Sequence, residues 1–334
     1  MENKQIRLAA RPVGTPKSTD FNTTIEILNP LSKNDVLVEI QYISLDPAMR
    51  GWMNVGKSYI RPVDIGEVMR AGGGGKVIAS ENAAFNVGDI VTGSFGVQQY
   101  FVAQDGKGLT KVDTRLAPLP KWLSVLGMTG MTAYFCLLEV GAPKAGDIVL
   151  VSGAAGAVGS IAGQIAKIKG CHVVGIAGGD DKVAFLLDEL HFDAAVNYKT
   201  GNLRSALRRA CPEGIDVYFD NVGGETLDIA LSMLRMKARI AICGAISGYN
   251  NADGPVGPKN YLSLLVNRAR MEGFVVFDHA AQFKNAAIEM ATWMREGKLK
   301  SVEYVVDGTV DNFHETMMML FEGDKIGKLL LKIK

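Results

Sequence analysis

Short apolar runs broken by turn residues characterise the first third of the chain. Hydrophobic stretches occur at 36–40, 75–79 and 89–93, and prolines and the glycine run 72–75 separate them. Short apolar runs bounded by proline and glycine are typical of strands. The pattern predicts a compact, mostly β domain over residues 1–121.

From about Trp122 onward, apolar runs alternate with stretches of helical periodicity. A continuous apolar strand is expected at 147–152, a helix at 160–169 and a second apolar strand at 171–177. Strands that alternate with helices indicate βαβ units and a buried parallel sheet. We therefore expect a doubly wound sheet over residues 122–299. Further expected elements are a helix at 124–140 and strands at 194–197, 215–220, 238–243 and 273–277.

The last segment, 300–334, returns to β character. The run 301–306 predicts one strand and the apolar ending 327–334 predicts another, which is expected to pair back into the N-terminal domain. The predicted fold class is therefore α/β, with a mostly β first domain and a doubly wound second domain.

Composition and charge narrow the class of protein. Of the 334 residues, 48% are hydrophobic and 21% are charged, and 36 Lys and Arg nearly balance 35 Asp and Glu, for a formal net charge of +1. A nearly neutral chain argues against nucleic acid or an anionic membrane as the main partner. The polar N-terminus predicts no signal peptide, and no apolar run predicts a membrane span. Four widely spaced cysteines predict reduced thiols in a cytoplasmic protein.

A glycine-rich turn joins the first expected strand of the second domain to the helix that follows. Gly156 and Gly159 have the spacing of the dinucleotide fingerprint, but Ala154 stands at its first glycine. Gly156 lets the backbone approach a pyrophosphate, Gly159 lets the helix pack closely on the strand, and the helix N-terminus supplies N–H donors. This context favours a dinucleotide site over a glycine-rich turn without a ligand.

The end of the next strand predicts which nicotinamide cofactor binds. An NAD-selective site places an acidic side chain there to accept both ribose hydroxyls. Here Gly178 and Gly179 leave room, and Lys182 is placed to meet the 2′-phosphate of NADPH as a point charge. A solvated lysine near the start of a helix is the alternative, and Asp180 or Asp181 would repel the phosphate if either carboxylate pointed toward it.

Several motifs in a fixed order extend this pattern along the whole chain. They are Ser-Leu-Asp-Pro-Ala-Met-Arg-Gly at 44–51, the glycine turn 153–159, and the stretches 163–167, 170–175, 219–224, 243–247 and 270–276. Together they resemble the medium-chain dehydrogenases/reductases. The resemblance is to the zinc-free branch of leukotriene B4 12-hydroxydehydrogenase, also called prostaglandin reductase or alkenal/one oxidoreductase, and of curcumin reductase.

The resemblance implies a GroES-like catalytic domain, a Rossmann domain, a tail that returns to the first domain, NADPH as reductant and a homodimer. It also implies cofactor contacts at the pyrophosphate, the 2′-phosphate and the nicotinamide half. By position these contacts are Gly156, Ala157, Val158 and Gly159, then Lys182 and Tyr198, then Asn221, Cys243, Gly244, Ala245, Ile246, Ser247, Tyr249, Phe274, Val275 and Val276. Lys325 departs from the family, which has an asparagine there, so that contact stays open.

The sequence lacks the ligand pattern of a catalytic zinc site. Zinc alcohol dehydrogenases of this superfold use Cys, His and carboxylate ligands and a loop of closely spaced cysteines. Here the cysteines are far apart, and His172, His191, His279 and His314 show no ligand spacing. We expect no catalytic metal and interpret the histidines as surface or core residues.

A metal-free site favours reduction of a conjugated double bond over reduction of an isolated ketone. A ketone would need its alkoxide stabilised by hydrogen bonds alone, whereas an enone accepts hydride at its β-carbon and spreads the charge into an enolate. The sequence therefore predicts NADPH-dependent reduction of the carbon–carbon double bond of α,β-unsaturated aldehydes and ketones.

Two tyrosines are candidate donors to the enolate oxygen. Tyr249 follows a strand end that should border the nicotinamide, and Tyr59 resembles a substrate-side tyrosine of the curcumin-reductase branch. Each has the alternative of an aromatic side chain that only lines the cleft. Asp46 and Arg50 are interpreted as an ion pair that fixes a turn, and the methionines 317–319 as core.

Two other functions stay open. A quinone reductase of the same superfamily shares the cofactor turn but commonly lacks the Leu-Asp-Pro-x-Met-Arg motif present at 45–50. A redox sensor would bind NADPH without turnover. The physiological substrate does not follow from the sequence.

Overall fold

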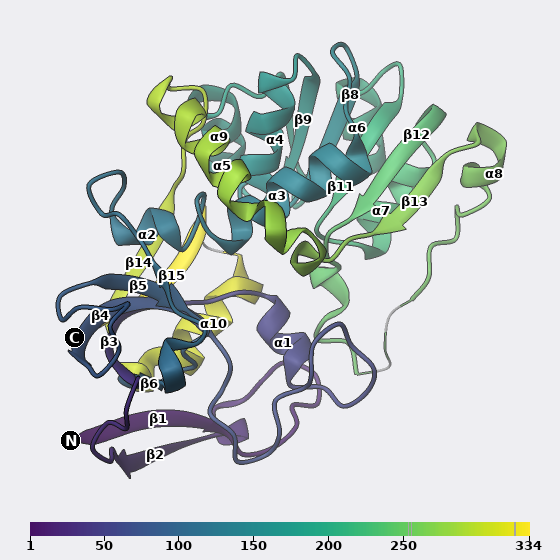
Figure 1. Cartoon of the computed structure of the whole chain (residues 1–334). Helices are drawn as coiled ribbons and strands as arrows, with labels where there is room; N and C mark the ends of the chain where they lie inside the picture. Colours follow the sequence, from purple (N-terminus) through teal and green to yellow (C-terminus); the bar gives the residue numbers. More distant parts are fainter. Residues whose placement is uncertain (253, 255, 324) are drawn as a thin grey trace. The chain divides into compact units, whose positions relative to one another are not determined.

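The computed structural model describes residues 1–334 except 253, 255 and 324, and it divides into two compact units (Figure 1). Unit 1 comprises Met1–Leu123, Glu303–Lys325 and Leu329–Lys334, and unit 2 comprises Ser124–Val302 and Ile326–Lys328. Each unit has its own sheets and its own hydrophobic core. These units are defined by how closely the chain packs. The functional domains expected from the sequence, with boundaries after residues 121 and 299, stay a prediction.

Unit 2 is built on a six-stranded parallel sheet. Its strands are β8 (Ile148–Ser152), β9 (His172–Ala177), β10 (Ala194–Asn197), β11 (Ile215–Asp220), β12 (Leu234–Ile242) and β13 (Arg270–Gly273). They lie in the order β10-β9-β8-β11-β12-β13. All five residues of the central β8 are buried, as a parallel strand covered on both faces requires. The predicted doubly wound sheet is confirmed.

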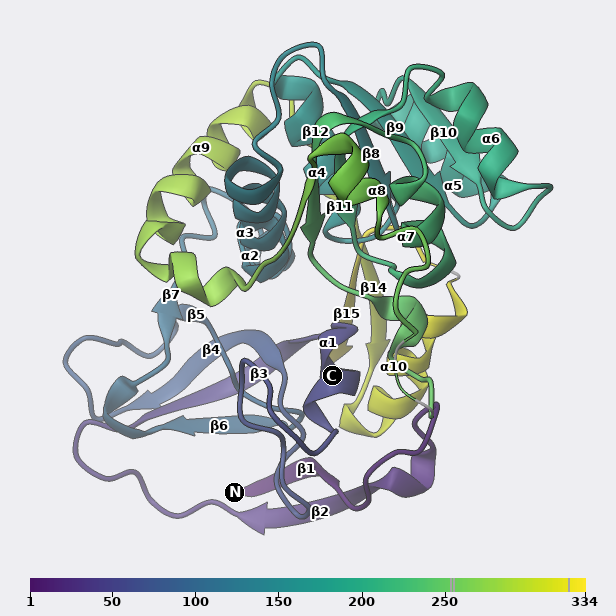
Figure 2. The same cartoon turned by 90° about the vertical axis from the view of Figure 1, so that its right-hand side faces the viewer.

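Helices cover both faces of this sheet. They are α3 (Met128–Phe135), η3 (Cys136–Gly141), α4 (Gly159–Ile168), α5 (Asp180–Ala184), η4 (Phe185–Glu189), α6 (Leu203–Ala210), α7 (Gly224–Leu231), η5 (Ile246–Gly248), α8 (Ser263–Asn267), η6 (Val276–Gln282) and α9 (Phe283–Arg295). In Figure 2, α3, α4 and α9 lie on one side of the sheet, and α6 and α7 lie on the other. This arrangement leaves the ends of the strands as the place for loops that bind ligands.

The helix expected at 124–140 is shorter than the periodicity predicts. The hydroxyl of Thr129 and the N–H of Gly130 both donate to the Ser124 carbonyl oxygen at 3.0 Å, so a turn precedes the helix. After Phe135 the chain continues as a π-helical turn, which Ala142 ends with a left-handed φ of 41°. The apolar pattern continues through all three conformations, so it could not separate them.

The strand expected at 273–277 is wrong. β13 ends at Gly273, and a 3-10 helix begins at Val276. The rings of Phe274 and His279 stack with their centroids 5.4 Å apart. An apolar run that packs its aromatic ring in this way needs no strand.

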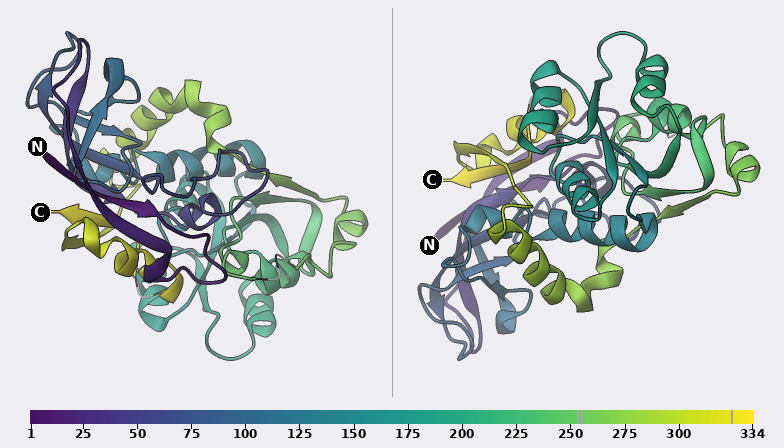
Figure 3. Two further views of the ribbon diagram at one scale, coloured as in Figure 1. Left: turned by 90° about the horizontal axis from the view of Figure 1, so that it is seen from below. Right: turned by 90° about the horizontal axis from the view of Figure 1, so that it is seen from above.

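Unit 1 consists mainly of antiparallel strands. They are β1 (Glu2–Leu8), β2 (Phe21–Ile27), β3 (Val36–Ser44), β4 (Gly72–Ser80), β5 (Ile90–Gly93), β6 (Tyr100–Ala103), β7 (Thr110–Lys111), β14 (Glu303–Gly308) and β15 (Lys328–Ile333). The larger sheet has the order β14-β15-β3-β4-β5-β7, with β6 also on β3, and β1 pairs with β2. β15 lies antiparallel to β3, with Leu331 opposite Ile43. Figure 3 shows both chain ends in this unit.

Short helices complete unit 1. They are η1 (Ser18–Asp20), α1 (Ala48–Trp52), η2 (Gln104–Gly106), α2 (Leu119–Trp122), η7 (Val310–Asn312) and α10 (Phe313–Glu322). Met317 of α10 is fully buried, and Met318 and Met319 pack against the same core. The interpretation of the three methionines as core is confirmed.

Arg50 fixes a loop, but not by the expected ion pair with Asp46. Its guanidinium donates to the carbonyl oxygens of Pro12 at 3.2 Å and Gly14 at 2.9 Å, and to the side-chain oxygen of Asn54 at 2.5 Å. Arg50 is 4% exposed. The backbone carbonyls therefore satisfy its donors, and that interpretation of Asp46 and Arg50 was wrong.

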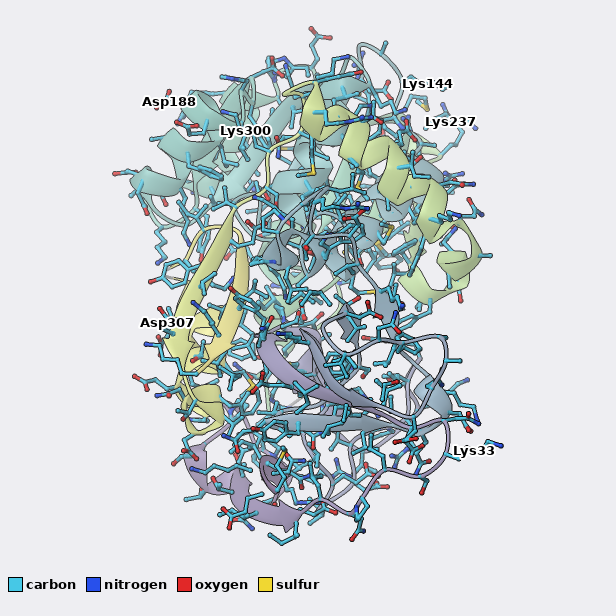
Figure 4. All side chains as sticks on the ribbon, turned by 60° about the vertical axis from the view of Figure 1, so that its left-hand side comes forward. Lys33, Lys144, Asp188, Lys237, Lys300 and Asp307 are labelled. Carbon is cyan, nitrogen blue, oxygen red and sulfur yellow. The ribbon has the colours of Figure 1, made fainter. Side chains whose placement is uncertain are left out.

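Charged residues of both signs are spread over the surface. The labelled side chains Lys33, Lys144, Asp188, Lys237 and Lys300 are all exposed (Figure 4). Within the described part of the chain, no helix has the length and apolar character needed to cross a membrane.

Candidate active site

The candidate site lies at the carboxyl ends of the parallel strands of unit 2. β8 and β11 are neighbours, but the chain continues from β8 to β9 on one side and from β11 to β12 on the other. The strand order therefore reverses between β8 and β11. Open α/β sheets bind their ligands at such a switch point, beside the carboxyl ends of the strands.

The glycine turn follows β8 directly. Gly153 has a φ of +58°, a left-handed conformation that favours glycine. A Cβ on Gly159 would collide with the carbonyl oxygen of Gly153, and a Cβ on Gly156 would lie 3.2 Å from it. Gly153 supplies the positive φ, so Ala154 does not weaken the turn. Ala154 is buried, and its N–H donates to the Ile176 carbonyl oxygen at 2.9 Å.

The N-terminus of α4 suits an anion. Among the described residues, no side chain caps this ten-residue helix, and its first turn contains no acid. The helix dipole and the N–H groups of the first turn favour a phosphate at this position. The tail lies beside the turn, because the N–H of Gly327 donates to the Ala155 carbonyl oxygen at 2.8 Å.

The buried carboxylate of Asp220 ties the ends of β8 and β11 together. Its Oδ1 accepts hydrogen bonds from Ser152 Oγ at 3.0 Å and Tyr218 Oη at 2.7 Å, and from the N–H groups of Val222 and Gly223 at 2.9 Å each. Its Oδ2 is buried without a hydrogen-bond partner among the described residues. Burial and the nearby Asp220 charge raise the pKa of Tyr218 well above its usual value, so this phenol remains a donor.

Asn221 is fixed at the same switch point. Its Nδ2 donates to the Ser152 carbonyl oxygen at 2.7 Å, and its N–H donates to Ser152 Oγ at 3.0 Å. The segment after β12 is attached to the same loop. The N–H of Ile246 donates to the Asn221 carbonyl oxygen at 3.1 Å, and the hydroxyl of Ser247 donates to the Val222 carbonyl oxygen at 2.6 Å. The structure therefore brings Asn221 together with the segment that follows β12.

Tyr249 folds back over the end of β12. Its Oη accepts the N–H of Ala245 at 3.2 Å, and a Cβ on Gly244 would lie 3.1 Å from the same oxygen. That Cβ would also lie 3.4 Å from the Asn221 carbonyl oxygen. The hydroxyl of Tyr249 is thus placed at the same strand ends as Asn221.

Lys182 and Tyr198 lie at the turn that follows β9. Lys182 is only 9% exposed on α5. The ring of Tyr198 packs on Gly178, where a Cβ would lie 2.7 Å from the ring carbon Cε1. The N–H of Tyr198 donates to the Ala177 carbonyl oxygen at 3.0 Å. The two residues therefore border the same turn.

The segment after β13 contains Phe274, Val275 and Val276. The His279 ring lies between two phenyl rings, with its centroid 5.4 Å from that of Phe274 and 4.8 Å from that of Phe135. The interplanar angles are 20° and 12°, so the three rings form a stack. His279 thus anchors this segment to α3.

Tyr59 belongs to unit 1. It is 55% exposed, and its Oη accepts a hydrogen bond from Trp52 Nε1 at 3.3 Å. The Arg70 guanidinium lies 5.6 Å from the centre of the Trp52 ring. Tyr59 is therefore held by Trp52, which in turn contacts Arg70. A role for Tyr59 toward the substrate stays a prediction.

The four cysteines are free thiols. Burial raises the pKa of Cys171 and of Cys211 to about 11 each, and a hydrogen bond with Cys243, together with burial, raises the pKa of Cys136. Thiols with raised pKa values are poor nucleophiles at neutral pH. Over the part of the chain that the structure describes, no three His, Cys, Asp or Glu side chains gather as metal ligands.

Two compact units, one of them with a glycine turn at the switch point of a doubly wound sheet, define the fold class of dinucleotide-binding α/β proteins. Two family models match the chain, one described as the N-terminal domain of oxidoreductase over residues 4–112 and one described as zinc-binding dehydrogenase over residues 157–293. The chain belongs to the medium-chain dehydrogenase/reductase superfamily, in the zinc-free branch of the curcumin, alkenal and prostaglandin reductases.

Individual relatives match over almost their whole length. The chain is 37% identical to the NADPH-dependent curcumin reductase of Escherichia coli, over 99% of this chain and 97% of the relative. It is 39% identical to the NADP(+)-dependent 2-alkenal reductase of Nicotiana tabacum, over 100% of this chain and 98% of the relative. The crystal structure of CurA from Vibrio vulnificus in complex with NADPH matches with a TM-score of 0.94 and 40% identity, over 99% of both chains.

NADPH is the cofactor, as expected from the sequence. The residues of unit 2 fit this cofactor. The glycine turn packs tightly, since a Cβ on Gly159 would collide with the Gly153 carbonyl oxygen, and the N-terminus of α4 next to it suits a pyrophosphate. The protein is therefore an NADPH-dependent reductase.

Proposed function

We propose that this reductase acts on the carbon–carbon double bond of α,β-unsaturated aldehydes and ketones. The observation that carries the proposal is the position of the Tyr249 hydroxyl, at the strand ends that also hold Asn221. The names of the 2-alkenal reductase and the curcumin reductase support this substrate class. When bound, NADPH supplies a hydride from its nicotinamide ring, and the β-carbon of the substrate is the acceptor.

In this proposal, unit 2 holds the cofactor along the carboxyl edge of its sheet. The turn 156–159 binds the pyrophosphate, and Lys182 and Tyr198 bind the 2′-phosphate. The nicotinamide half contacts Asn221, Tyr249 and the segments 243–247 and 274–276. Asp220 positions Asn221 and the loop after it, because it binds the N–H groups of Val222 and Gly223.

Tyr249 stabilises the enolate in this proposal. Its hydroxyl donates toward the carbonyl oxygen of the substrate, where negative charge gathers as the β-carbon is reduced. The Ala245 N–H that binds the phenol oxygen offsets part of the charge left on that oxygen as the proton moves. A proton from water then adds to the α-carbon, the hydroxyl proton returns to Tyr249 as the carbonyl group re-forms, and the substrate has gained one hydride and one proton. Tyr59 is the second candidate for contact with the substrate.

Tyr249→Phe tests this assignment. We expect kcat for a medium-chain 2-alkenal to fall by about 100-fold, since the variant loses the enolate donor, with a much smaller change in the dissociation constant for NADPH, because the aromatic ring is kept. Tyr304→Phe, at a tyrosine of unit 1 that is 41% exposed, is the matched control and should keep full activity. An unchanged rate for Tyr249→Phe with NADPH still bound would show that the tyrosine is not the donor.

We also propose that the chain forms a homodimer through β13. β13 is the last strand of its sheet, and all four of its residues are exposed. In α8, Leu265 is 75% exposed and Val266 is 67% exposed. An open strand edge beside apolar side chains suits a second copy related by two-fold symmetry.

Light scattering tests the dimer. The measured mass should be twice the 35.9 kDa mass of the chain, and Leu265→Glu should give a lower measured mass. A monomer at every concentration would contradict the proposal.

We further propose a cytoplasmic location. All four cysteines are free thiols, which suits a reducing compartment. Recovery of the protein from a membrane or extracellular fraction of the source cells would contradict it.

A further inference from the structure

Asp180 occupies a position that matters for the choice between NADPH and NADH. β9 ends at Ala177, and two glycines lead from it into Asp180, the first residue of α5. A carboxylate near this strand end can accept the ribose hydroxyls of NADH, and it repels the 2′-phosphate of NADPH. NADPH dependence therefore requires this charge to be directed elsewhere.

Asn197 binds the carboxylate of Asp180. Asn197 is the last residue of β10 and lies opposite Ala177 in the parallel pairing of β9 with β10. Its Nδ2 donates to Asp180 Oδ1 at 2.7 Å. Its Oδ1 accepts the N–H groups of Gly179 at 3.1 Å and Lys199 at 3.0 Å.

The two backbone contacts determine which way the amide faces. Only the oxygen of an asparagine side chain accepts hydrogen bonds, so the N–H groups of Gly179 and Lys199 hold Oδ1 toward the backbone. The NH2 group is then aimed at Asp180. An aspartate at position 197 would keep both backbone contacts but would place a second carboxylate against Asp180. Mutation can therefore separate the shape of the turn from the amide donor.

We propose that Asn197 is a positioning residue for cofactor selectivity, which draws the carboxylate of Asp180 toward β10 and away from the 2′-phosphate of NADPH. This inference rests on the proposed assignment of Lys182 and Tyr198 to that phosphate. The surrounding geometry supports it, because Tyr198 follows Asn197 directly and its ring packs on Gly178. Loss of the amide releases a negative charge beside the residues that hold the phosphate.

The test compares two nucleotides that differ only in this phosphate, 2′,5′-ADP and AMP, by calorimetry on the full chain. Asn197→Ala is expected to lower the preference for 2′,5′-ADP by up to about fivefold, the size of one charge contact near the surface. In the Asp180→Ala background the same change is expected to have no further effect, because Asn197 acts through that carboxylate.

Two further variants separate selectivity from folding. Asn197→Asp keeps the acceptor for Gly179 and Lys199 but sets a second carboxylate against Asp180, so it should lower the preference at least as much as Asn197→Ala. The thermal midpoints of both variants show that each one is folded at the temperature of the titration. Asn202→Ala is the matched control. Asn202 also binds a backbone N–H, that of Ser205 at 2.9 Å, and its loss should leave the preference unchanged.

Lys182→Ala tests the assignment on which the inference rests, and it should weaken binding of 2′,5′-ADP but not of AMP. If it weakens neither, the assignment of the phosphate site is wrong. If it weakens 2′,5′-ADP selectively while Asn197→Ala leaves the preference unchanged, the inference about Asn197 is wrong. An equal effect of Asn197→Ala with and without Asp180 would also overturn it.

Discussion

Single residues at the switch point show what a sequence pattern can and cannot specify. The spacing of Gly156 and Gly159 predicted a dinucleotide turn, and NADPH is the cofactor. The fingerprint places a glycine where the chain has Ala154, but the positive φ belongs to Gly153, one residue earlier. A motif records spacing, whereas the backbone conformation decides which glycine is indispensable.

Gly159→Ala is expected to weaken NADPH binding by at least about tenfold and to lower the free energy of unfolding by about 1–3 kcal/mol. The new Cβ would collide with the Gly153 carbonyl oxygen and push α4 away from the turn. Fluorescence titration with NADPH and urea denaturation measure the two effects. Gly257→Ala is the control, since its Cβ would meet nothing within 4 Å. Identical behaviour of the two variants would contradict the role given to Gly159.

Hydrogen-bond partners between distant segments could not be predicted from the sequence. Asp220 and Asn197 each stand at the last position of a predicted strand, which was the available signal. Neither the hydrogen bond that Ser152 donates to Asp220 nor the contact of Asn197 with Asp180 follows from spacing along the chain. Both depend on the order of strands in the sheet, because each contact joins residues from neighbouring strand ends.

At the scale of elements, apolar runs with clear ends were predicted best. The strands expected at 194–197 and 215–220 have the observed bounds of β10 and β11. The run 273–277 was misassigned, because apolar residues that pack by ring stacking resemble those of a buried strand. The helix expected at 124–140 joined a turn, an α-helix and a π-helical turn into one periodic stretch.

The connection between β8 and β11 leads to a prediction for Asp220→Ala. The change leaves buried donors without an acceptor, including the hydroxyls of Ser152 and Tyr218. The free energy of unfolding should fall by about 3 kcal/mol or more, measured by urea denaturation. Asp188→Ala, at an exposed aspartate visible in Figure 4, is the control and should stay within about 0.5 kcal/mol. Equal stability of both variants would show that Asp220 does not hold the strand ends.

At the scale of the whole molecule, the resemblance noted from seven motifs is confirmed by relatives that match almost the entire chain. The tail serves both units, since residues 326–328 belong to unit 2 and residues 329–334 to unit 1. The family and the cofactor could be predicted because their motifs are local. The substrate could not, because its recognition depends on side-chain positions that no local motif encodes.

The central claim is that the enzyme reduces the alkene and leaves the carbonyl group. Its most direct test is a turnover of a medium-chain 2-alkenal with NADPH that contains deuterium at the transferable position of nicotinamide C4, followed by mass spectrometry and NMR of the product. The account predicts a saturated aldehyde with deuterium on its β-carbon. An allylic alcohol with deuterium on the former carbonyl carbon would contradict it.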